Sequence, residues 1–146
     1  MNSPLFKRVN LCVSDLDRSL VIYRDILGFS VDYQKVSDEN SYSYPVLAFP
    51  EKVNLRFATL NTPTQERALA LTEVKGIKLP LMPEPRMAAA VINCSEFDEV
   101  LGEVTLQGLT VINPQVLPDK NGLPKGREAA FLDPDGHLIV IYVLDD

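Results

Sequence analysis

Two similar stretches lie about 80 residues apart in the sequence, and this repetition constrains the fold more than any other feature. The first is VNLCVSDLDRSLVIYRDILGFSV (9–31) and the second is AVINCSEFDEVLGEVTLQGLTV (90–111). Each begins with an apolar, strand-like run, continues with helical periodicity and reaches a glycine followed by a β-prone segment. The pattern predicts two copies of one supersecondary unit.

The helical part of each stretch has its own start and stop signals. Ser14 with Asp17, and Ser95 with Asp98, have the Ser-x-x-Asp spacing that resembles a capping box at a helix start. Gly28 and Gly108 follow the last periodic residues, as expected of left-handed caps at helix ends. The apolar positions predicted to face a sheet are Leu16, Leu20, Tyr23 and Leu27 in the first helix, and Phe97, Val100, Leu101 and Val104 in the second.

More strand-like runs complete each copy. They are NLRFATLN (54–61) and RALALTEV (67–74) in the first half, and REAAFLD (127–133) and HLIVIYV (137–143) in the second. The segment KGIKLPLMPEP (75–85) is too rich in proline to be helical and reads as a linker. We therefore predict an α+β domain spanning residues 1–146, built of two tandem βαβββ modules at about 5–75 and 86–146.

Composition limits the partners. The net charge of −6 and the scattered Lys and Arg residues argue against nucleic acid and weakly favour a cationic ligand. No apolar run approaches the ~20 residues that span a bilayer, and the start MNSPLFKRVN lacks the apolar core of a signal peptide, so no membrane association and a cytoplasmic location are expected. Cys12 and Cys94 lie in apolar runs and are expected to be buried free thiols.

Two stretches, RVNLCVSDLDRSLVIYRDILGF (8–29) and FLDPDGHLIVIY (131–142), resemble the signatures of the vicinal oxygen chelate superfamily. That superfamily includes glyoxalase I, extradiol dioxygenases, methylmalonyl-CoA epimerase and the bleomycin-resistance proteins. The resemblance covers nearly the whole chain and implies a glyoxalase-like fold, in which curved mixed sheets enclose a cavity and the helices lie outside. It does not indicate any one activity.

The resemblance also implies where metal ligands would lie in this chain. The family positions at the first and last strands of each module fall on Arg8, Ala70, Ala89 and Val140, or near Arg86 in place of Ala89 if the strand is shifted. Arginine stays protonated, and alanine and valine have no donor atoms, so none of these side chains binds a metal. The resemblance thus predicts a member that lacks the metal ligands, with no metal and no cofactor.

Strand alternation predicts which side chains face the cavity. Tyr42 and Tyr44 are added from the segment 37–52, which is expected to cover the cavity as a loop together with the segment 116–129. The small apolar residues could instead belong to a filled core, Arg8 could lie on the surface, and the tyrosines could merely anchor their loop. The cavity candidates are Arg8, Asn10, Tyr42, Tyr44, Ala70, Thr72, Ala89, Val91, Asn93, Val140 and Tyr142.

The predicted function is binding of a small, largely apolar or aromatic molecule, for sequestration or resistance, by a homodimer whose open sheet edges are covered. A second hypothesis is a metal-independent isomerase or lyase in which Arg8 steadies an enolate or carboxylate. Its proton-shuttling residue would be Glu73, Glu128, Tyr42 or His137, although His137 is expected to hydrogen-bond locally after its turn. The sequence also leaves open a divalent-metal enzyme with unrecognised ligands and a regulatory dimer with a collapsed cavity.

Overall fold

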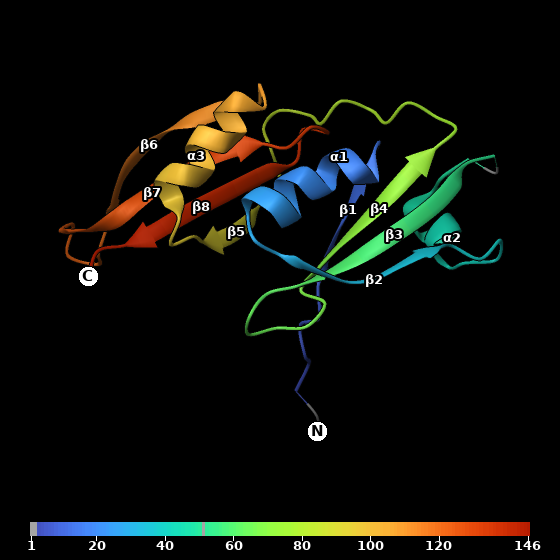
Figure 1. Ribbon diagram of the computed structural model, residues 1–146, viewed down its shortest axis with the longest axis horizontal. Helices are drawn as coiled ribbons and strands as arrows, with labels where there is room; N and C mark the ends of the chain where they lie inside the picture. The colour runs from blue at the N-terminus through green and yellow to red at the C-terminus, as the bar shows by residue number, and fades with distance from the viewer. Residues whose placement is uncertain (1–2, 51) are drawn as a thin grey trace. The chain divides into compact units, whose positions relative to one another are not determined.

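The computed structural model describes residues 3–50 and 52–146. The chain forms two compact units, one running to Pro80 and the other spanning Leu81–Asp146. Each unit contains one four-stranded mixed sheet, in which the first strand pairs in parallel with the last. Figure 1 shows a helix lying across one face of each sheet. The predicted α+β class and the two βαβββ modules are confirmed.

Unit 1 has the strand order β1-β4-β3-β2. Its first helix continues without a break into a π-helical segment, where the N–H of Leu27 donates to the carbonyl of Ile22. Leu16, Leu20 and Tyr23 of this helix are buried, as their spacing predicts. The elements are β1 (Val9–Val13), α1 (Leu16–Leu20), η1 (Val21–Ile26), β2 (Ser30–Val36), α2 (Ser43–Leu47), β3 (Asn54–Asn61) and β4 (Leu69–Lys75).

Unit 2 repeats this plan with the strand order β5-β8-β7-β6. Phe97, Val100 and Val104 are the buried residues of its helix. β8 lies between β5 and β7. Its Ile139 and Ile141 are fully buried and its Val140 and Tyr142 are half-buried, which explains an apolar run in an acidic chain. The elements are β5 (Ala90–Asn93), α3 (Phe97–Leu106), β6 (Val111–Pro118), β7 (Pro124–Leu132) and β8 (Leu138–Leu144).

The predicted helix caps are wrong at the start of each helix and right at the end. Asp15, not Ser14, is the N-cap of α1, and its carboxylate accepts a hydrogen bond from the N–H of Arg18. Glu96 occupies the corresponding position of α3 and makes no side-chain cap hydrogen bond. Gly28 and Gly108 have φ values of 89° and 78°, the left-handed conformation expected beyond each helix end.

Both predicted cover loops contain regular structure. The segment 37–52 includes the helix α2, which Figure 1 shows on the side of β3 away from α1. The segment 116–129 is mostly a hairpin, because β6 extends to Pro118 and β7 begins at Pro124. Only 119–123 remains as the turn between them.

Among the described residues, no helix is long and apolar enough to cross a membrane.

Candidate functional site

One face of the sheet in unit 1 is covered by α1, and we call the opposite face the open face. The Glu73 carboxylate accepts a hydrogen bond of 2.8 Å from the backbone N–H of Leu16 in α1, so Glu73 lies on the helix side of β4. Successive side chains of a strand alternate between faces. Ala70 and Thr72 therefore lie on the open face.

The same reasoning assigns the faces of unit 2. Arg127 on β7 reaches α3, where its guanidinium forms an ion pair of 2.9 Å with Asp98 and lies 4.7 Å above the centre of the Phe97 ring. Arg127 pairs with Val143 on β8, so Val143 and its alternate neighbours face the helix. Val140 and Tyr142 consequently lie on the open face of this sheet, as alternation predicts.

Three of the predicted cavity residues are neighbours on the open face of unit 1. Asn10 pairs with Ala70 across the parallel strands, and the Thr72 hydroxyl donates to the Asn10 side-chain oxygen at 2.7 Å. Nearby on β3, the buried Thr59 hydroxyl has no hydrogen-bond partner among the described residues. This face therefore carries the Thr59 and Thr72 hydroxyls beside the larger Phe57, which pairs with Thr72, and sequence reasoning missed both Phe57 and Thr59.

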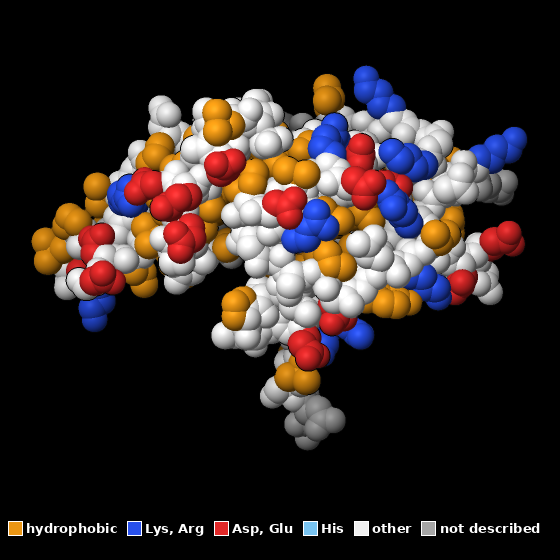
Figure 2. Space-filling view, viewed as in Figure 1, with side chains coloured by type: hydrophobic (Ala, Val, Ile, Leu, Met, Phe, Trp, Pro, Cys, Tyr) orange, Lys and Arg blue, Asp and Glu red, His pale blue; other side chains and the backbone are white. Residues whose placement is uncertain are grey.

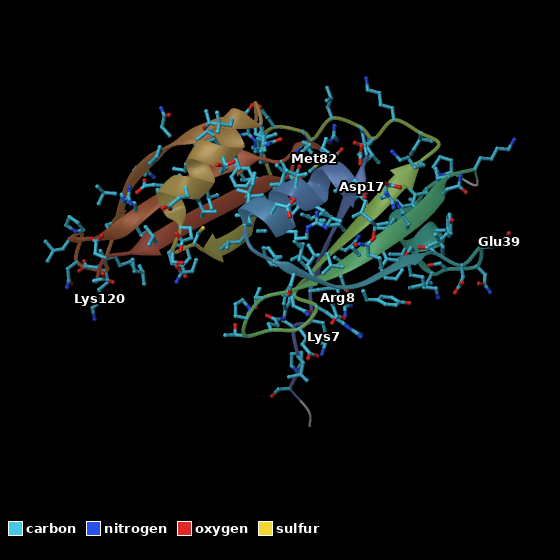
Figure 3. The ribbon with its side chains drawn as sticks, in the orientation of Figure 1. Lys7, Arg8, Asp17, Glu39, Met82 and Lys120 are labelled. Carbon is cyan, nitrogen blue, oxygen red and sulfur yellow. The ribbon has the colours of Figure 1, made fainter. Side chains whose placement is uncertain are left out.

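Arg8 is exposed at the entrance to β1, and its Nε donates to the carbonyl oxygen of Arg67 at 3.3 Å. In Figure 3, Arg8 lies beside the loop that joins β3 to β4. This hydrogen bond agrees with a surface position for Arg8 rather than an inward-facing one. The guanidinium thus contacts the backbone of Arg67, just before β4.

The two tyrosines predicted to line the cavity have different environments. Tyr42 is 80% exposed. Tyr44 packs with Phe49 against the buried cluster of Val53, Leu55 and Val74, and its hydroxyl lies 3.5 Å from the carbonyl oxygen of Val53. This part of the open face is filled by the α2 segment, so Tyr44 acts there as a core residue.

The open face of unit 2 is more apolar and more exposed. Val91 is 64% exposed and Asn93 is also exposed, while Val140 and Tyr142 beside them are half-buried. Ala89 precedes β5 and is exposed. Glu128 contributes a carboxylate, which accepts a hydrogen bond of 3.2 Å from Gln115 on β6. This face thus offers an apolar surface with a few polar groups, the usual make-up of a ligand site.

A pocket enclosing about 220 Å³ lies at one end of this face. Leu138 contributes from β8, and Gly136 from the turn before it. The remaining residues come from the proline-rich segment between β4 and β5, in which Met82 is labelled in Figure 3. Sequence reasoning predicted a linker for residues 75–85 and the opening of the second module from residue 86, and it did not predict this pocket. The lining residues are Met82, Pro83, Arg86, Met87, Ala88, Gly136 and Leu138.

The candidate acid–base residues do not come together within either unit. Glu73 is 4% exposed and receives two hydrogen bonds from Arg56, of 2.8 and 3.0 Å. Arg56 lowers the pKa of Glu73, and the hydrogen bond from Leu16 acts in the same direction against the effect of burial. The carboxylate is therefore ionised at neutral pH, and its hydrogen bonds lie on the helix side of the sheet. The backbone N–H of His137 donates to Asp133 within the local turn, as expected of that position.

Among residues 3–50 and 52–146, no three or more His, Cys, Asp or Glu side chains are grouped so as to hold a metal ion. Two of the four family ligand positions, Ala70 and Val140, lie on open faces and have no donor atoms. Arg8 is hydrogen-bonded to backbone, and Ala89 is an exposed alanine. The residues at these positions do not fit a divalent metal.

The exposed surface of the helix in unit 2 carries charge, whereas most of its apolar residues are buried. Figure 2 shows acidic side chains gathered over α3, whose first turn contains Asp98 and Glu99. The hydrogen bond from Arg127 lowers the pKa of Asp98. These are solvated ion pairs that join helix and strand, so the open faces and the pocket remain the better candidates for ligand binding.

A family model described as Glyoxalase/Bleomycin resistance protein/Dioxygenase superfamily matches residues 5–141. No curated protein sequence matches the chain. Among solved structures, a glyoxalase family protein from Bacillus cereus superposes with a TM-score of 0.77 at 16% identity, covering 99% of this chain and 97% of the other.

Two further structures are similar over most of their length. The trypanothione-dependent glyoxalase I of Leishmania major has a TM-score of 0.62 at 22% identity, covering 98% of this chain and 87% of its own. The fosfomycin resistance protein FosX of Listeria monocytogenes, complexed with Mn(II) and sulfate, has a TM-score of 0.59 at 18% identity, covering 99% and 95%. At these identities the likeness concerns the fold.

Proposed function

Since the chain belongs to the Glyoxalase/Bleomycin resistance protein/Dioxygenase superfamily, we propose that it is a member that binds a small, largely apolar molecule without a resident metal. The observation that carries the proposal is the chemistry of the open faces. They carry Ala70 and Val140 at two of the positions where the family resemblance implies metal ligands, and they offer amide and hydroxyl groups for orientation. Apolar walls with few polar groups suit binding rather than metal chemistry.

A binding role also agrees with the contacts that the candidate acid–base residues make. Glu73 is committed to Arg56, and Glu128 accepts a hydrogen bond from Gln115. Tyr42 is exposed on the α2 segment. Proton transfer to a substrate requires an acid or base within hydrogen-bond reach of the reacting group, and Glu73 is instead buried on the helix side of its sheet. We therefore favour sequestration or sensing over an isomerase or lyase.

The test is a thermal-shift screen with one-ring and two-ring aromatic compounds, after dialysis against EDTA. A ligand that binds only the folded state should raise the melting temperature by roughly 2–5 °C at about ten times its Kd. Val140→Lys places a charge on the open face and should abolish the rise. Leu106→Lys, at an 80% exposed position of α3, is the matched control and should retain it.

Two results would contradict the proposal. One is a stoichiometric transition metal in the purified protein, by elemental analysis, whose removal abolishes ligand binding. The other is a screen in which no aromatic compound raises the melting temperature. The proposal also requires that the Val140→Lys protein unfolds cooperatively without ligand, so that its loss of response reports on binding.

A further inference from the structure

One residue in the otherwise apolar lining of the pocket beside Leu138 has a charged side chain. Six of the seven lining residues are methionine, proline, alanine, glycine or leucine, and the seventh is Arg86. The carboxylates of the adjoining turn are not part of this lining. Asp133 is instead turned to its own backbone, where it accepts hydrogen bonds of 2.9 and 2.8 Å from the N–H groups of Asp135 and His137.

Among the described residues, the ion-pair partner of Arg86 is a weak one. Its Nη2 lies 3.4 Å from a carboxylate oxygen of Glu84, whose side chain is 77% exposed, whereas that of Arg86 is 33% exposed. An ion pair this open to water contributes little to stability. An incoming carboxylate could replace Glu84 at small cost, because Glu84 would return to water. The planar guanidinium also matches a carboxylate in a two-point hydrogen bond.

The methionines provide the apolar part of the pocket. Met82 is 46% exposed and Met87 is 85% exposed. Their unbranched side chains adapt to the shape of a bound ring and make favourable contacts with it. Gly136 has a positive φ of 88°, and a Cβ built on it would lie 3.2 Å from Cγ of Met82. Any larger residue there would displace this wall.

We infer that this pocket binds small organic acids whose apolar body, such as one aromatic ring, lies against the methionines and whose carboxylate is held by Arg86. The inference rests on the proposed binding function and specifies its ligand class. The volume of about 220 Å³ is below the range of roughly 300–1,000 Å³ for drug-sized ligands, which limits the ligand to about one ring. The net charge of −6 alone favours a cation, but its long-range repulsion is screened beyond about 8 Å at physiological salt.

The test compares phenylacetate with phenylacetamide, which has nearly the same shape but no charge, by isothermal titration calorimetry at physiological ionic strength. We expect the acid to bind roughly tenfold more tightly than the amide, as a charge-assisted hydrogen bond implies. Arg86→Gln should remove this preference, because it should weaken binding of the acid more than binding of the amide. Glu84→Gln should preserve or increase it, since the competing carboxylate is gone.

A control variant and a second readout locate the effect. Lys120→Gln removes the same charge from the β6–β7 turn, far from Met82 within this unit in Figure 3, and should leave the preference intact. With ¹³C-methyl methionine, phenylacetate should shift the Met82 and Met87 signals, identified by their leucine variants. Binding that moves neither signal would overturn the assignment.

The failure of this inference is distinguishable from failure of the proposed function. Equal affinity for acid and amide, or a preference that survives in Arg86→Gln, would overturn the carboxylate site while leaving small-molecule binding intact. If neither probe binds but another aromatic compound raises the melting temperature, only the inference fails. If no compound binds at all, both fail.

Discussion

Glu73 is a buried carboxylate that joins three elements of unit 1. From β4 it accepts hydrogen bonds from the N–H of Leu16 at the start of α1 and from Arg56 on β3. Arg56 in turn lies 3.5 Å from Asp17. A charge this buried is tolerated only when it is paired and hydrogen-bonded. Glu73 therefore fixes where the helix begins over the sheet.

Replacing Glu73 with glutamine should lower the free energy of unfolding by about 1–3 kcal/mol, because Arg56 loses its charged partner. This loss in the free energy of unfolding is smaller than for a fully buried ion pair, because the Arg56 side chain is 37% exposed. Urea denaturation measures the change. Asp38→Asn breaks the exposed pair with Lys35 and should change stability by less than about 0.5 kcal/mol.

The same pair gives the stability a defined pH dependence. The pKa of Glu73 is lowered in the folded state, chiefly by the hydrogen bond from Arg56. Its stabilisation is therefore complete above the unfolded pKa of about 4.3 and is lost as the pH falls through the folded pKa below that value. The difference between wild type and Glu73→Gln should shrink over that acid range. A difference that is constant from neutral pH down to acid unfolding would contradict this role.

Local residue roles are the hardest to predict from the sequence. A helix start is indicated correctly near residue 15, but Ser14 and Asp15 are both good N-cap residues, and only the backbone geometry selects Asp15. Glu73 is a candidate proton shuttle on sequence alone because a lone acid in a strand reads as functional. Its pairing with Arg56 depends on the register of β3 against β4, which periodicity does not reveal.

At the scale of elements, β7 and β8 approach unusually closely at Gly126. A Cβ built on this residue would clash with the carbonyl oxygen of Val143 and lie 3.0 Å from Cα of Leu144. Both atoms belong to the backbone of β8, so they cannot turn aside as a flexible side chain would. The absence of a side chain at residue 126 thus permits this end of the hairpin to form.

Gly126→Ala should therefore destabilise the protein by roughly 1–3 kcal/mol, as overpacking does in a tight core. Gly102→Ala is the matched control, because a Cβ there meets nothing within 4 Å and Gly102 lies in α3. Alanine is the better helix former, so this variant should gain about 0.5–1 kcal/mol. Thermal or urea unfolding of the two proteins should give shifts of opposite sign.

Most strands could be predicted because their apolar runs are bounded by turn residues, and the predicted range 54–61 coincides with β3. The helix α2 was missed because it has five residues and contains Pro45, too short for a periodic pattern. The β6–β7 hairpin was underestimated because of its prolines. Pro114 is tolerated since β6 is an edge strand with a register shift there, and Pro124 opens its strand.

At the scale of the whole molecule, the duplication made the architecture predictable. Apart from α2 in unit 1, the two halves repeat the same order of elements and the same strand pairing, with the first and last strands parallel neighbours in each. The binding residues were less accessible to sequence reasoning. Strand alternation assigned Thr72 and Val140 to the open faces. The pocket, however, depends on how an irregular, proline-rich segment packs beside Leu138. Because such a segment has no periodic pattern, its packing could not be predicted from the sequence.

That segment is also the covalent tether between the halves, and this has a practical consequence. Arg86 is a trypsin site within it, and the carboxylate that would neutralise the guanidinium would also hide it from the protease. A carboxylate ligand bound in the pocket should therefore slow trypsin cleavage after Arg86 more than cleavage after Lys120. The masses of the fragments over time would measure the ratio of the two cleavage rates. The rate of cleavage in the segment that joins the two units would therefore report whether the pocket holds a ligand.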